Sequence, residues 1–129
     1  MCDSGGTYQD VGSITTTGSA TAYNTSSDRR LKQGFSDLTD VGGIIDAVSP
    51  RRWSWKVNGN PGIGFIAQEL VVFVPEAVTI GDNDPNLESN QPGFTGWARD
   101  DSKLVPYLWA EVKALRARVA AMEQKMAKD

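Results

Sequence analysis

A serine and a lysine lie five positions apart in the run Ser27-Asp28-Arg29-Arg30-Leu31-Lys32. A serine hydroxyl becomes a nucleophile when a neighbouring base takes its proton. A lysine amine can be that base if burial or nearby positive charge lowers its pKa, and Arg29 and Arg30 would act in that direction. The run follows a stretch rich in Gly, Ser and Thr. These residues suggest that the chain cuts itself where an extended segment meets a folded domain.

The same run also has a purely structural interpretation. Ser and Asp side chains often cap the first turn of a helix, and solvated arginines commonly follow them. Regular structure does not bring Ser27 to Lys32, because five residues correspond to about 140° around an α-helix and to opposite faces of a strand. A turn over residues 28–31 must therefore align the two side chains if they react together.

The composition restricts the available catalytic groups. The sequence has no histidine, and its single cysteine is Cys2. Ser-His-Asp and Cys-His catalysis are therefore excluded. A zinc site lacks its usual nitrogen and sulfur ligands, and the run Asp82-Asn83-Asp84 is more typical of a solvated turn than of a site for a hard cation. We expect neither a metal nor a cofactor.

Length and charge fit a small assembling protein. The 129 residues suffice for one domain with appendages, and the net charge is −3. Basic residues gather over 29–56 and 103–128 and acidic ones over 82–101, a pattern that suits contacts between segments or subunits. No basic stripe with interleaved aromatics appears, so we expect no nucleic-acid partner. No signal peptide or membrane-spanning stretch is visible, so we expect no membrane partner.

The pattern of apolar and turn residues predicts a mixed α+β fold after an extended N-terminal segment. Residues 1–26 are expected to be a flexible linker or the end of a β-rich fibre stem. Apolar spacing after Leu31 favours helical turns. The further predicted elements are a short helix over 40–48, a hairpin of strands 52–57 and 62–67 around Asn58-Gly59-Asn60, a short helix over 68–74, a strand over 77–80 and a long loop over 81–102.

The C-terminal segment has the clearest periodicity. Seven apolar residues follow one another at spacings of three and four: Val105, Leu108, Val112, Leu115, Val119, Met122 and Met126. This spacing predicts a helix with a heptad seam that associates with other copies, and Pro106 fits its first turn. Valine and leucine in alternate layers favour two strands, although a fused domain can impose another number. The alternative is an amphipathic helix packed on its own domain.

Five segments in order resemble the intramolecular chaperone auto-processing domain at the C-terminus of phage tailspikes, endosialidases and tail fibres. The resemblance covers about residues 24–123. It rests on the runs Ser27-Asp28-Arg29-Arg30-Leu31-Lys32, Trp53-Ser54-Trp55-Lys56, Gly64-Phe65-Ile66-Ala67-Gln68-Glu69-Leu70, Val74-Pro75-Glu76-Ala77-Val78, and Lys103-Leu104-Val105-Pro106-Tyr107-Leu108 leading into Glu111-Val112-Lys113-Ala114-Leu115.

The resemblance implies a homotrimer that promotes folding of the stem preceding it in the same polypeptide, and then releases itself. The family's serine–lysine pair falls on Ser27 and Lys32, which implies a single-turnover serine endopeptidase that cuts between Ser26 and Ser27. The implied setting is phage tail assembly in the host cytoplasm, with the domain released or retained at the fibre tip.

Together, these observations and the resemblance predict a trimeric α+β domain. It would consist of a small aromatic-cored β-hairpin and helix domain with a long C-terminal helix. Its parts are a stem end or linker over 1–26, a chaperone core over 27–103 with the protruding loop 81–102, and a heptad helix over 104–129. Two alternatives remain open. One is a non-proteolytic trimerisation module that stays intact. The other is a receptor-binding fibre tip that uses Phe94 and Trp97 of the loop.

Overall fold

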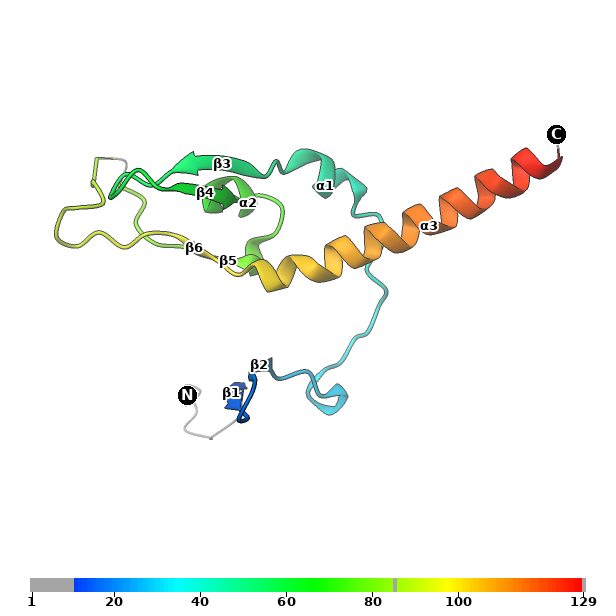
Figure 1. Cartoon of the computed structure of the whole chain (residues 1–129), viewed down its shortest axis with the longest axis horizontal. Coiled ribbons are helices and arrows are strands. Elements are labelled where there is room, and N and C mark those ends of the chain that lie inside the picture. The colour runs from blue at the N-terminus through cyan, green and yellow to red at the C-terminus, as the bar shows by residue number, and fades with distance from the viewer. Residues whose placement is uncertain (1–10, 85, 129) are drawn as a thin grey trace. The chain divides into compact units, whose positions relative to one another are not determined.

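The computed structural model describes residues 11–84 and 86–128 and has a mixed α+β fold, as predicted (Figure 1). Each of its three sheets is a two-stranded antiparallel ribbon. The chain divides into two compact units, Met1–Asp37 and Leu38–Asp129, which we describe separately. The run from Ser27 to Lys32 lies in the first unit.

The first unit contains a hairpin and a turn. Strand β1 (Gly12–Thr16) pairs with β2 (Thr21–Thr25), and Gly12 lies opposite Thr25. Every residue of both strands is exposed. A two-stranded hairpin without a buried face is marginal alone in water. Its Thr-rich strands therefore provide extended structure next to the Ser27 turn but no core.

The second unit begins with a helix and a hairpin. The predicted short helix is confirmed as α1 (Gly42–Ala47), and the predicted hairpin as β3 (Arg51–Ser54) with β4 (Pro61–Gly64). Both strands end three residues earlier than the predicted 52–57 and 62–67. Beyond Ser54, Trp55 N–H donates to the Asn60 carbonyl at 2.8 Å, and the Trp55 carbonyl accepts a hydrogen bond of 2.7 Å from Gly59 N–H, which closes the turn. Gly59 has φ +71°, a conformation that glycine adopts without strain.

Short elements connect this hairpin to the C-terminal helix. Helix α2 (Ala67–Leu70) is shorter than the predicted helix over 68–74 and is followed by the 3₁₀ turn η2 (Pro75–Ala77). Strand β5 (Val78–Thr79) pairs with β6 (Ala98–Arg99), so part of the predicted loop is a strand. The 3₁₀ turn η3 (Asp101–Leu104) leads into α3 (Val105–Lys128), which confirms the predicted C-terminal helix.

The core of the second unit is aliphatic, which corrects the prediction of an aromatic core. Six hydrophobic residues are buried among those described: Val41, Ala67, Leu70, Val74, Ala77 and Leu104. Trp53 and Trp55 instead contact each other edge to face at 5.6 Å on the hairpin. The Arg99 guanidinium lies 5.8 Å from the centre of the Trp53 ring, joining β6 to that hairpin. The two tryptophans therefore pack against each other on the hairpin and are not part of the buried core.

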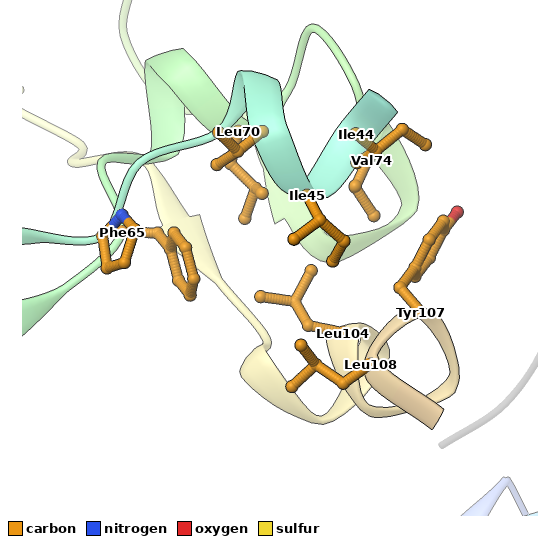
Figure 2. Close-up of a pocket in the computed structure, with 10 residues that line it drawn as sticks. Ile44, Ile45, Phe65, Leu70, Val74, Leu104, Tyr107 and Leu108 are labelled. Carbon is orange, nitrogen blue, oxygen red and sulfur yellow. The ribbon is translucent and has the colours of Figure 1, made fainter. Parts of the chain in front are cut away.

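An apolar cavity of about 180 Å³ adjoins this small core (Figure 2). Leu70, Val74, Leu104 and Leu108 are among its lining residues. A core of this size stabilises a domain only modestly, since small domains bury a small share of their surface. The second unit by itself therefore leaves apolar surface available for other contacts.

Val74→Ala is expected to lower the free energy of unfolding of the second unit by about 2 kcal/mol, because removing buried methyl groups loses their transfer energy and leaves a void. Val74 is 1% exposed. Val72→Ala is the matched control, since Val72 is 72% exposed in the same segment, and it should change stability by less than about 0.5 kcal/mol. Urea unfolding of both variants measures the difference, and equal losses would contradict this packing.

Among the described residues, the heptad seam of α3 is exposed beyond its first turns, where Leu108 lines the cavity beside the core. Its seven residues are between 44% exposed, at Leu115, and 74% exposed, at Met126, and no residue of α3 is buried. Only the first turns of the helix contact the core, where Tyr107 packs on the cluster and its hydroxyl donates a hydrogen bond to the Glu76 carboxylate. Beyond its first turns the helix is therefore not packed on its own unit, which disfavours the alternative of an amphipathic helix packed on its own domain.

None of the described helices has the length and apolar content that crossing a membrane requires.

Candidate cleavage site

The structure brings the candidate nucleophile and base together. Lys32 Nζ donates a hydrogen bond of 2.6 Å to Ser27 Oγ. Between them lies the 3₁₀ turn η1 (Arg29–Leu31), while Asp28 before it and Lys32 after it are both extended. A turn over residues 28–31 was expected if Ser27 and Lys32 are to meet, and η1 is that turn. A turn of this kind reverses the chain direction enough for two side chains five residues apart to meet.

Asp28 holds the turn in place. Its carboxylate accepts hydrogen bonds from Arg30 N–H at 2.8 Å and from the Arg30 guanidinium Nη2 at 2.8 Å. The Arg30 guanidinium, followed by its backbone N–H and the charge of Lys32, lowers the pKa of Asp28. Because folding lowers this pKa, the charged cap is fully present at neutral pH and is lost when acid protonates the carboxylate. The predicted Asp cap and the Ser27–Lys32 contact are thus features of one turn.

The two arginines of the turn differ in their surroundings. Arg30 forms an ion pair with Asp28. The Arg29 guanidinium lies 4.6 Å from the centre of the Phe35 ring. The sequence had placed Phe35 on a helical face, but residues 32–41 contain no helix. The contact between Phe35 and Arg29 was not predicted, because a cation–π contact across a turn has no fixed sequence spacing.

The bond before Ser27 directly follows the hairpin. Ser26 N–H donates a hydrogen bond of 3.0 Å to the Val11 carbonyl, just beyond the last paired residues of β1 and β2. This bond ties the backbone N–H of Ser26 to the end of the hairpin. Ser26, Ser27 and Lys32 are all exposed, so water can reach the bond between Ser26 and Ser27. The site therefore combines a hydroxyl and an amine in contact with each other and an accessible peptide bond directly before them.

The loop after β5 packs on itself. Asp82 N–H donates to the Thr95 carbonyl at 2.8 Å, and Thr95 N–H donates to the Asp82 carboxylate. The half-buried Trp97 donates from Nε1 to the Asp82 carbonyl at 2.6 Å. Trp97 thus helps to close the loop, while Phe94 remains 41% exposed. Within residues 11–84 and 86–128, no group of three or more acidic or thiol side chains is placed to hold a metal ion.

Comparison with known proteins identifies the segment that begins at the candidate nucleophile. Residues 27–79 match the model of peptidase family S74, described as the chaperone of endosialidase. The match confirms the resemblance inferred from the sequence, and its first residue is Ser27. No curated protein and no solved structure matches the chain.

Proposed function

Since residues 27–79 match the model described as the chaperone of endosialidase, we propose that this chain is a C-terminal intramolecular chaperone that trimerises and assists folding of a phage tailspike or tail-fibre stem. It then releases itself by cutting the bond between Ser26 and Ser27. The observation that carries the proteolytic part is the 2.6 Å contact between Lys32 Nζ and Ser27 Oγ, located at the first residue of the family match.

The chemistry follows from the atoms at the turn. Lys32, once neutral, takes the proton of Ser27 Oγ, and the oxygen attacks the Ser26 carbonyl carbon. The C–N bond between the two residues breaks as the departing nitrogen receives a proton from Lys32, which leaves an ester between Ser26 and the Ser27 side chain. Water then hydrolyses this ester. The products are a chain that ends at Ser26 and a domain that begins with the free amine of Ser27.

Assembly is proposed to control this reaction. A lysine loses its proton more readily when it is buried or close to other positive charges, and Lys32 is exposed in a single chain. Neighbouring copies that cover the turn would supply that burial. Cleavage would then follow association, so the stem is separated from its chaperone only after the copies have come together.

Exposed apolar surface supports the assembly part of the proposal. Six hydrophobic residues of the described chain are buried, while the seam of α3 and apolar residues such as Val57 and Ile63 are exposed. Large exposed apolar surfaces usually mark contacts with other molecules. The partners proposed are two further copies of this chain and the preceding stem. The proposed setting is tail assembly in the host cytoplasm, with the domain then released or retained at the fibre tip.

Lys32→Ala is expected to slow cleavage by roughly a hundredfold or more at neutral pH, because a positioned general base contributes about that much. Lys32→Arg keeps the positive charge but cannot give up its proton at neutral pH, so it should be as slow as Lys32→Ala. The measurement is the rate of fragment appearance after refolding, followed from pH 6 to 10. Full activity of Lys32→Arg would show that Lys32 acts through its charge and not as a base.

A non-proteolytic trimerisation module is the second candidate. The observation that favours it is the Asp28 cap, because the Asp28–Arg30 pair explains the turn without any reaction. This candidate keeps the assembly surface of α3 and predicts an intact chain in the oligomer. The mass of the denatured protein distinguishes the two functions.

A further inference from the structure

Five of the seven charged residues of α3 lie beside its apolar seam, and the other two, Lys113 and Lys128, lie at outer positions. With Val112 and Leu115 as positions a and d of a heptad, Glu111 and Arg118 occupy position g, and Arg116 and Glu123 occupy position e. The outer positions b, c and f carry mainly alanine: Ala110, Ala114, Ala117, Ala120, Ala121 and Ala127. The solvated face of a helix usually carries most of its charged residues. In α3 the outer face is mainly alanine, and most of the charged residues border the seam.

Neither glutamate of α3 is placed for an ion pair along its own helix. Side chains three or four residues apart are neighbours on a helix. Tyr107, Leu108, Ala114 and Leu115 occupy those positions around Glu111, and Val119, Ala120, Met126 and Ala127 occupy them around Glu123. Among the residues that the structure describes, no ion pair involves α3. Ion pairs within the helix therefore do not explain the positions of Glu111 and Glu123.

We propose that two ion pairs beside the seam set the register in which α3 lies along α3 of neighbouring copies of this chain, with the helices parallel. In parallel coiled coils, position g faces the e position five residues later on the neighbouring helix. This geometry pairs Glu111 with Arg116 of the next copy, and Arg118 with Glu123 of the next copy. Both pairs have opposite charge. The inference rests on the proposed self-association and adds its orientation and register.

The same charges oppose a shifted alignment. If one helix slips by a heptad, Glu111 faces Glu123 on one side of the interface. On the other side Arg118 faces Arg116, and only Lys125 gains an opposite charge, at Glu123. Two like-charge pairs then outnumber one attractive pair, and the apolar seam is also shortened. A seam of valine, leucine and methionine layers has little register preference of its own, so these charges specify the alignment.

The second unit leaves space for such neighbours. The seam residues Val112, Leu115 and Val119 are all exposed, and none of α3 is buried. In Figure 1 the helix continues well past the elements of its own unit, α1 and the β3–β4 hairpin. Only Glu111, among the four paired residues, lies near another element, since its carboxylate is beside Gly42 of α1. The Arg118–Glu123 pair is therefore the cleaner one to test.

Charge exchange on the full chain tests the proposal by sedimentation equilibrium. Glu123→Arg places like charges opposite Arg118 in every copy and should weaken association by at least about tenfold. The double variant Glu123→Arg with Arg118→Glu should restore it, because the pair is reversed but still attractive. Gln124→Arg is the matched control at outer position f, and it should associate like the wild type.

A disulfide tests the orientation in the same chain. Met122→Cys in a Cys2→Ser background should cross-link copies through position 122, which lies opposite itself only in a parallel, in-register seam. Absence of this cross-link in an associated protein, or no loss of association in Glu123→Arg, would overturn the inference and leave the proposed assembly intact. A wild-type chain that is monomeric at all concentrations would instead overturn the assembly proposal itself.

Discussion

Ser27→Ala is expected to stop cleavage between Ser26 and Ser27, by roughly a thousandfold or more, while leaving the oligomer unchanged. Loss of a nucleophile removes the covalent step, and only slow background hydrolysis remains. The hydroxyl contacts Lys32 Nζ in an exposed turn and supports no core residue, so its removal should not affect folding. The measurement is fragment formation over time on a denaturing gel, together with size-exclusion chromatography of the native protein.

Ser26→Ala is the matched control for this variant. Position 26 contributes its carbonyl and its N–H bond to Val11, and alanine retains both groups. Cleavage should therefore proceed at a rate close to that of the wild type. If Ser27→Ala still produces the same fragment, or if Ser26→Ala is the variant that stops cleavage, the nucleophile is not Ser27.

Leu115→Asp is expected to prevent association of the chain, lowering its affinity by at least about a thousandfold. Leu115 lies in the middle of the α3 seam and is exposed in a single chain. A carboxylate in a buried layer replaces a favourable apolar contact with an uncompensated charge, and every copy in the assembly contributes one. Light scattering over a range of concentrations measures the change.

Ala117→Asp supplies the comparison for Leu115→Asp. Ala117 is exposed two residues away at outer position f, so the same new charge should leave the oligomer intact. If assembly controls the reaction, Leu115→Asp should also cleave slowly, whereas Ala117→Asp should cleave at the normal rate. A Leu115→Asp chain that remains fully oligomeric would show that other surfaces hold the copies together.

The sequence predicted the elements with strong local signals. The heptad spacing and Pro106 predicted α3, and Asn58-Gly59-Asn60 predicted the turn of the β3–β4 hairpin. The requirement for a turn over 28–31 was predicted because regular structure cannot join Ser27 to Lys32. In each case the signal lies within a few residues, where backbone geometry limits the possible arrangements.

Other features depend on contacts between distant segments, and these were missed. The tryptophans looked like core residues, but Arg99 and the Trp55 ring hold Trp53 on the hairpin surface. Strand β6 was missed because two residues, Ala98 and Arg99, pair with β5 across a long loop. The pairing of Arg30 with Asp28 was missed as well, because charge counting does not show which of two adjacent arginines turns toward the carboxylate.

The most direct test of the proposed function is the intact mass of freshly folded protein under denaturing conditions, with the Ser27→Ala variant beside it. Self-cleavage predicts a wild-type species whose mass corresponds to a chain beginning at Ser27, and its absence from the variant. A wild-type protein that is oligomeric yet retains the mass of the full 129 residues would contradict self-cleavage and leave assembly as its function.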